Sequence, residues 1–138
     1  MKKHILVVDD EPAIRYPIIF MLSKTGYKVS EARDGLEALN LILHAEDQGD
    51  PFDLLLTDIR MPRMSGMELI HELKWNEINL PVIAISGMPD EELVQKLLNI
   101  GCSGYIMKPF DIQDLIRQVE QVLHGRAKTG RSYNSQAF

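Results

Sequence analysis

Short runs of apolar residues, rich in Val, Ile and Leu, recur along the chain between longer and more mixed stretches. Near-continuous apolar runs this short are typical of β-strands that are covered on both faces. We therefore expect five strands, of which the second and the fifth have the weaker signal. The runs cover residues 5–8, 29–32, 54–56, 82–85 and 105–107.

The stretches between these runs carry apolar residues three or four positions apart, which is the spacing of one face of an α-helix. Each of five such stretches therefore predicts a helix that follows a strand. Alternating strands and helices form a parallel sheet with right-handed crossovers and with helices on both faces. The apolar positions are Ile14, Ile18, Met21 and Leu22; Leu36, Leu39, Ile42 and Leu43; Met67, Ile70 and Leu73; Leu93, Val94, Leu97 and Leu98; and Leu115, Ile116, Val119, Val122 and Leu123.

Residues that start and stop helices agree with this pattern. Pro12 suits the first turn of the first helix, Ser65 is a candidate N-cap of the third, and Gly125 suits the end of the fifth. Pro17 does not fit, because a proline inside a helix removes one hydrogen bond at a cost of about 3 kcal/mol. Either the first helix is kinked at Pro17 or it begins later than the pattern suggests.

Size and charge indicate one globular domain. The chain has 138 residues, a 45% hydrophobic content and a net charge of -5. Residues 126–138 carry three basic residues, no acid and little apolar content, so they predict a flexible basic tail or the start of a linker. The domain proper is therefore expected at residues 1–125, and its net charge without the three positive charges of the tail is -8.

Composition excludes several classes of protein. The acidic balance argues against direct nucleic-acid binding by this domain. The single cysteine, Cys102, leaves no partner for a disulfide within the chain. Neither a signal peptide nor an apolar stretch of the ~20 residues that a membrane span needs is present in the sequence. We predict a soluble cytoplasmic protein with no membrane partner.

Chemically reactive side chains follow the predicted strands. Asp9 and Asp10 follow the first strand, Asp58 the third, Ser86 the fourth and Lys108 the fifth. In an open parallel α/β sheet, ligands bind beyond the carboxyl ends of the strands. These five side chains are therefore expected to converge at one edge of the sheet.

This set of groups fits phosphoryl transfer. Clustered carboxylates repel one another, and Mg²⁺, which prefers oxygen ligands, would offset that repulsion. A lysine and a hydroxyl are not needed to hold the metal, but they suit phosphoryl oxygens, which require cations and hydrogen-bond donors. The alternative reading of Asp9 and Asp10 as a helix N-cap explains neither Asp58 nor Lys108.

Four segments of the chain carry a resemblance to a known family. They are "ILVVDDEP", "DLLLTDIRMPRMSGMEL", "PVIAISG" and "GYIMKPF", and they occur in this order at suitable distances. Over roughly residues 3–124 the sequence resembles the receiver domain of two-component response regulators. The resemblance implies an α/β, flavodoxin-like (βα)5 three-layer sandwich with a parallel five-stranded sheet of order 2-1-3-4-5 and a site at its switch point.

The resemblance also implies the acceptor and the metal ligands. Asp58 would take a phosphoryl group from a phosphohistidine of a sensor kinase. Asp10 would bind Mg²⁺ directly, together with Asp58, and Asp9 would lie nearby through water or as a second ligand. Arg60 would offer its backbone carbonyl to the metal.

Three further residues would respond to the phosphoryl group. Lys108 would pair with Asp58 and later with the phosphoryl oxygens, and the Lys108–Pro109 peptide bond would be cis. Ser86 would turn its hydroxyl onto the phosphoryl group, and Tyr105 would act as an aromatic switch that moves as Ser86 moves. A tyrosine in a strand is also often only part of the core.

The partners follow from the same resemblance. A sensor histidine kinase or phosphotransfer protein would supply the phosphoryl group. The face formed by the fourth helix, the fifth strand and the fifth helix would then bind a downstream effector protein or domain, and a homodimer through that face is possible. On this interpretation the chain is a phosphoprotein switch that catalyses only its own phosphorylation and dephosphorylation.

Two other functions fit the same fold class. A Mg²⁺-dependent phosphohydrolase also uses an aspartyl nucleophile, but it usually needs a second acid two residues later, where this chain has Arg60. A flavin-binding electron carrier would need a Gly/Thr-rich phosphate loop after the first strand, which the sequence lacks.

Arg60 and Met88 are expected to set the lifetime of the phosphorylated form. Each lies two residues after a site residue, Asp58 and Ser86 respectively, where members of this family border the phosphoryl group. Neither side chain offers a carboxylate or amide that could align an attacking water molecule. The sequence therefore predicts slow loss of the phosphoryl group.

Overall fold

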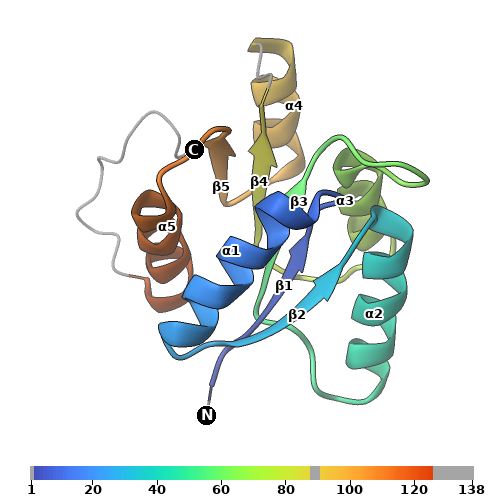
Figure 1. Ribbon diagram of the computed structural model, residues 1–138. Helices are drawn as coiled ribbons and strands as arrows, with labels where there is room; N and C mark the ends of the chain where they lie inside the picture. The colour runs from blue at the N-terminus through green and yellow to red at the C-terminus, as the bar shows by residue number, and fades with distance from the viewer. Residues whose placement is uncertain (1, 88–90, 126–138) are drawn as a thin grey trace.

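The computed structural model describes residues 2–87 and 91–125, which form one parallel sheet flanked by helices (Figure 1). The five strands lie in the order β2-β1-β3-β4-β5, as expected, so the flavodoxin-like fold is confirmed. The elements along the chain are β1 (His4–Val8), α1 (Pro12–Lys24), β2 (Lys28–Ala32), α2 (Gly35–Asp47), β3 (Leu54–Asp58), α3 (Gly66–Trp75), β4 (Val82–Ser86), α4 (Glu91–Ile100), β5 (Gly104–Met107) and α5 (Ile112–His124).

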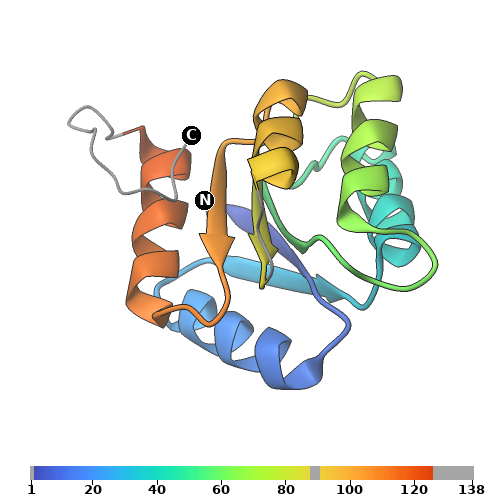
Figure 2. The ribbon, with the colours of Figure 1, turned by 90° about the horizontal axis from the view of Figure 1, so that it is seen from above.

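Two apolar cores lie on opposite faces of the sheet, which explains why the strands are apolar without alternation. Successive strand residues point to opposite faces, so Leu6 and Val8 of β1 pack under α2, α3 and α4, whereas Ile5 and Val7 pack under α1 and α5. The same division holds along β3 and β4. Figure 2 shows the sheet between these two helical layers.

Residues at the helix ends match the capping residues expected from the sequence. Ser65 caps α3 in a capping box in which the Glu68 amide donates to Ser65 Oγ and the Ser65 amide donates to the Glu68 carboxylate. Gly125 ends α5 with a left-handed φ of 64°. α1 begins at Pro12 and contains Pro17, so of the two alternatives offered for Pro17 the later start is wrong.

Some residues that the sequence pattern assigned to buried helix faces are exposed, so those assignments are wrong. Leu36, Leu43 and Leu98 are exposed, because the buried face of each helix is narrower than the apolar pattern. In α2 that face is formed by Gly35, Ala38, Leu39 and Ile42. The small residues Gly35 and Ala38, which the apolar pattern passes over, therefore form half of the buried face.

Two predictions fall on segments outside the described residues. The tail at 126–138 and Met88 belong to these segments, so the expectations for them stay predictions. Within residues 2–87 and 91–125, none of the helices combines the length and the apolar character that crossing a bilayer requires.

Candidate functional site

Three aspartates from two neighbouring strands meet at the carboxyl edge of the sheet. Asp9 and Asp10 directly follow β1, and Asp58 is the last residue of β3, which pairs with β1. One carboxylate oxygen from each of the three lies within 4.8 Å of the others. Asp9 and Asp58 are buried and Asp10 is exposed, so the cluster is closed on one side and open to solvent on the other.

Lys108 is the cation that contacts this cluster. It follows β5, and its Nζ lies 3.2 Å from Asp9 Oδ2 and 3.4 Å from Asp58 Oδ1. Glu11, at 3.7 Å, is a third carboxylate near the same ammonium group, and the sequence analysis assigned it no role. The peptide bond from Lys108 to Pro109 is cis, as the resemblance implied.

The acidic cluster fits a divalent cation. Asp9 Oδ2 is buried, and no described residue makes a well-aligned hydrogen bond to it despite the nearby Lys108. A buried carboxylate oxygen without such a partner is costly, and three converging carboxylates form the hard oxygen site that Mg²⁺ prefers. Asp9, Asp10 and Asp58 are therefore the residues that could hold the ion.

Burial and mutual repulsion change the proton affinity of these acids. Burial, followed by the charge of Asp9, raises the pKa of Asp58 from 3.8 to about 6. Burial also raises the pKa of Asp9. Burial alone would lower the pKa of Lys108, but the carboxylates of Asp58 and Asp9 outweigh it and raise that pKa. In the metal-free protein, ionisation of Asp58 therefore costs folding free energy.

This cost predicts a specific pH dependence for metal-free protein. Because the folded-state pKa of Asp58 is raised, the folded state binds more protons than the unfolded chain between pH 4 and 6, and stability falls as pH rises through that window. In EDTA, Asp58→Asn should gain stability over the wild type from pH 4 to 7, by on the order of 3 kcal/mol. Urea unfolding of both proteins at four pH values measures this difference.

A matched control separates this effect from other titrations. Asp47→Asn changes an exposed aspartate at the end of α2, and its difference from the wild type should show no such trend. A pH-independent difference between Asp58→Asn and the wild type would contradict the burial argument.

The loop from Asp58 to α3 is fixed by two glycines. The Gly66 amide donates to the Ile59 carbonyl at 2.9 Å, and a Cβ on Gly66 would lie 2.2 Å from the Asp58 carbonyl oxygen. The Gly35 amide donates to the Met64 carbonyl at 3.0 Å, and a Cβ there would lie 2.5 Å from the same oxygen. Only glycine fits either position, so close backbone packing sets the position of Asp58.

Gly66→Ala is therefore expected to lower the free energy of unfolding by about 1–3 kcal/mol, because the added methyl group forces the Asp58 backbone away from α3. Urea unfolding measures the loss. Gly87→Ala is the control, because its new Cβ would meet Lys108 Cβ at an ordinary 3.6 Å. Equal stability of the two variants would show that the loop absorbs the methyl group without strain.

Arg15 is a site-supporting residue that the sequence analysis missed. It is 4% exposed, and its guanidinium donates to the Asp9 carbonyl at 2.7 Å and to the Glu31 carboxylate at 2.6 Å. It therefore holds the turn that carries Asp9 and Asp10. The sequence could have predicted that Arg15 is buried, because it lies three positions before Ile18 and seven before Leu22, on the buried face of α1.

The remaining predicted site residues lie around the same edge. Ser86 is the last residue of β4 and is buried beside the end of β3. The Tyr105 ring is buried in the core, and its hydroxyl donates to the Ser86 carbonyl at 3.3 Å. Arg60 is exposed two residues after Asp58. The predicted roles of these three residues stay predictions.

Sequence comparison relates this chain to proteins of signal transduction. The model of the family described as "Response regulator receiver domain" matches residues 5–120. Sensor histidine kinase TmoS of Ectopseudomonas mendocina is 40% identical over 121 residues, which are 86% of this chain and 12% of TmoS. Response regulator MprA of Mycobacterium tuberculosis is 33% identical over 123 residues, 89% of this chain. The chain spans about half of MprA, whose matched share is 51%.

Solved structures agree with this relationship along the length of the domain. A CheY-like receiver domain protein from Methanospirillum hungatei superimposes with a TM-score of 0.81 at 32% identity, covering 94% of this chain and 100% of that one. A chemotaxis response regulator of Vibrio cholerae gives a TM-score of 0.77 at 30% identity, covering 89% of this chain and 100% of the other.

Proposed function

This chain belongs to the response regulator receiver domain family, and we propose that Asp58 is the residue that accepts the phosphoryl group. As a receiver domain it is a phospho-accepting switch rather than an enzyme, with the Asp9, Asp10 and Asp58 cluster at its phosphorylation site and Lys108 nearby. The observation that carries the proposal is the contact between Lys108 Nζ and Asp58 Oδ1 at 3.4 Å, beside the two other carboxylates.

The transfer step follows from these positions. An oxygen of the Asp58 carboxylate forms a bond to phosphorus while the bond from phosphorus to the histidine nitrogen of a cognate kinase breaks. The imidazole leaves with that electron pair, and the product is an acyl phosphate. A carboxylate is a weak nucleophile, so positioning and charge neutralisation supply most of the catalysis. From its position beside Asp58, Lys108 neutralises negative charge on the oxygens of the phosphoryl group during transfer.

The metal site is the second part of the proposal. We assign Mg²⁺ to Asp9, Asp10 and Asp58, together with the backbone carbonyl of Arg60. A bound Mg²⁺ would neutralise charge on phosphoryl oxygens and relieve the repulsion among the carboxylates. Asp10, the exposed member, keeps the cluster open on the side where a phosphohistidine would approach.

Phosphorylation would change the contacts at the end of β4. The acyl phosphate adds about -1.5 to -2 charges and new acceptor oxygens, which the Ser86 hydroxyl and Lys108 can approach. The Tyr105 hydroxyl contacts the Ser86 carbonyl, so movement of Ser86 changes a contact in β5. The face of α4, β5 and α5 would then shift between two packings. We propose this face as the surface for a downstream effector, or for a homodimer.

A phosphohydrolase would need an acidic group that this chain does not have two residues after Asp58. Turnover of a phosphoester needs an acid to protonate the leaving oxygen, and the position two residues after Asp58 is the exposed Arg60. Incorporation of a radiolabelled phosphoryl group from acetyl phosphate with Mg²⁺, without many turnovers of phosphate release, tests the switch assignment.

The lifetime of the phosphoryl group gives a further prediction. Arg60→Asn combined with Met88→Glu introduces an amide and a carboxylate that can align water, so the double variant should lose its label several-fold faster than the wild type. The decay of the radiolabelled protein after removal of the donor measures this rate. Decay no faster than that of the wild type would count against the two positions.

A further inference from the structure

Side chains of α3 and α4 line a groove, and Figure 2 shows that α3 lies on the side of α4 that faces away from β5 and α5. It has a volume of about 520 Å³, and its lining residues are Met67, His71, Lys74, Lys96, Asn99 and Ile100. Met67 and Ile100 give it an apolar part, whereas His71, both lysines and Asn99 offer hydrogen-bond donors. None of these described residues is acidic, although the chain carries a net charge of -5.

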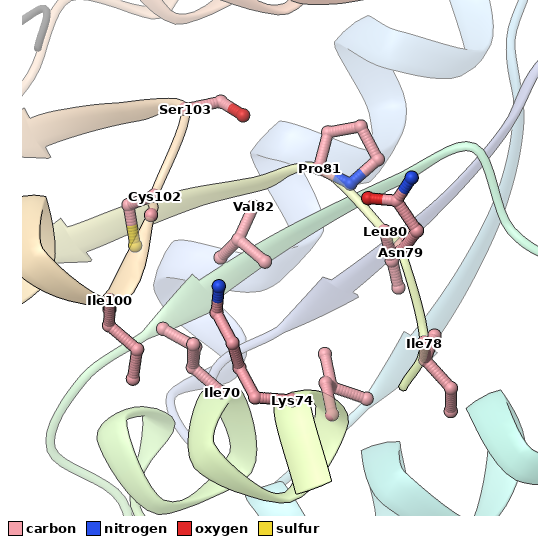
Figure 3. A pocket seen from close by; sticks show the side chains of 12 residues that line it. Ile70, Lys74, Ile78, Asn79, Leu80, Pro81, Val82, Ile100, Cys102 and Ser103 are labelled. Carbon is pink, nitrogen blue, oxygen red and sulfur yellow. The ribbon is translucent and has the colours of Figure 1, made fainter. Parts of the chain in front are cut away.

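The groove shares Lys74 and Ile100 with a deeper pocket of about 190 Å³. This pocket lies where β4 and β5 begin, at the opposite end of the sheet from the aspartates. Its walls combine the apolar side chains of Leu73, Leu80 and Val82 with the polar side chains of Asn79 and Ser103. Figure 3 shows the Lys74 side chain pointing toward Val82. A cavity of about 150 Å³ is large enough for a benzene ring, so by volume this pocket has room for one phenylalanine or leucine side chain.

The cations of the groove are available to a partner. Among residues 2–87 and 91–125, no carboxylate lies within ion-pair distance of Lys74. Lys96 has only Glu92, at 3.7 Å and exposed, and exposed pairs of this kind contribute little. Trp75 is 84% exposed and, with His71, Glu72 and Lys74, borders a neighbouring depression.

We propose that this α3–α4 groove binds an acidic peptide segment of a partner protein. One large apolar side chain of the peptide fills the deep pocket, and carboxylates beside it pair with Lys74 and Lys96. Two lysines in an acidic domain are too few to hold a nucleic-acid backbone, which is bound by extended basic surfaces. A peptide can supply groups for both features of this surface, a partly apolar pocket and the adjacent cations.

A selection experiment with random peptides tests this proposal without a guess about sequence. Phage displaying random dodecapeptides are selected on the wild-type chain after depletion on the Lys74→Glu, Lys96→Glu double variant. The expected survivors carry several Asp or Glu residues around one aromatic or leucine residue. Enrichment of basic peptides would overturn the proposal. Failure to enrich any peptide that distinguishes the two proteins would also overturn it.

The affinity of a selected peptide gives the quantitative test. Trp75 is the only tryptophan of the chain, so its fluorescence reports binding beside Lys74. The double variant should bind at least about tenfold more weakly, and so should a peptide whose apolar anchor is replaced by alanine. Lys2→Glu with Lys28→Glu makes the same change of net charge at exposed positions elsewhere and should bind as the wild type does.

Other outcomes assign the groove differently and contradict the proposal. Equal weakening by the control variant would show only non-specific attraction of charge. Dimerisation of the wild type but not of the double variant in sedimentation would assign the groove to a second copy of the chain. Because the deep pocket and the aspartates lie at opposite ends of the sheet, Asp58→Asn should bind the peptide normally, so the acceptor assignment and this one fail separately.

Discussion

Asp58→Asn is expected to reduce phosphoryl incorporation from acetyl phosphate to background while leaving the fold intact. An amide lacks the anionic oxygen that must bond to phosphorus, and neither Asp9 nor Asp10 replaces it. Asp9 is held by Lys108 and by the Glu11 amide, which donates to Asp9 Oδ1 at 2.9 Å. Incorporation of radiolabel into purified protein with Mg²⁺ measures the loss, and circular dichroism verifies the fold.

Two controls make this result specific. Asp47→Asn removes an exposed carboxylate outside the site and should be labelled like the wild type. In EDTA, Asp58→Asn should be more stable than the wild type at pH 7, because it lacks the buried charge. Labelling of Asp58→Asn equal to that of the wild type would refute the acceptor assignment.

Mg²⁺ is expected to stabilise the wild-type protein strongly and Asp10→Asn only weakly. A ligand that binds only the folded state at a hundredfold excess over its dissociation constant stabilises by about 2.7 kcal/mol. Here the ion would also relieve the repulsion that raises the pKa of Asp58. Thermal unfolding at pH 7 with increasing Mg²⁺ should therefore show a midpoint that rises steadily with concentration.

The matched variant for the metal is Asp50→Asn, an exposed aspartate in the loop after α2, which should respond to Mg²⁺ as the wild type does. Na⁺ at the same ionic strength should not reproduce the rise, since screening alone does not fill a site. An equal rise for the wild type and for Asp10→Asn would contradict the proposed ligand set.

Much of the fold could be predicted because a strand that is buried on both faces is apolar along its whole length. Residues 5–8 and 82–85 are apolar throughout because both faces of the sheet are covered, and the chemically reactive residues stand at the ends of such runs. The convergence of Asp9, Asp58 and Lys108 then follows from the parallel direction of the strands. These predictions rest on local pattern and on topology.

The parts that could not be predicted depend on contacts between distant segments. Gly35 and Gly66 are buried by backbone approach to Met64 and Asp58, which no periodic pattern reveals. Leu36 and Leu43 are apolar yet exposed, because the sheet admits only a narrow face of α2. The deep pocket below Lys74 arises where α3 and α4 leave a space between them, so it appears only in three dimensions.

The most direct test is to locate the phosphoryl group chemically. Protein incubated with acetyl phosphate and Mg²⁺ is treated with borohydride, which reduces an acyl phosphate of aspartate to homoserine, and the peptides are sequenced by mass spectrometry. We predict homoserine at position 58 and at no other aspartate. Homoserine at position 9 or 10, or a phosphoryl group that survives on a serine or histidine, would contradict the assignment of Asp58 as the acceptor.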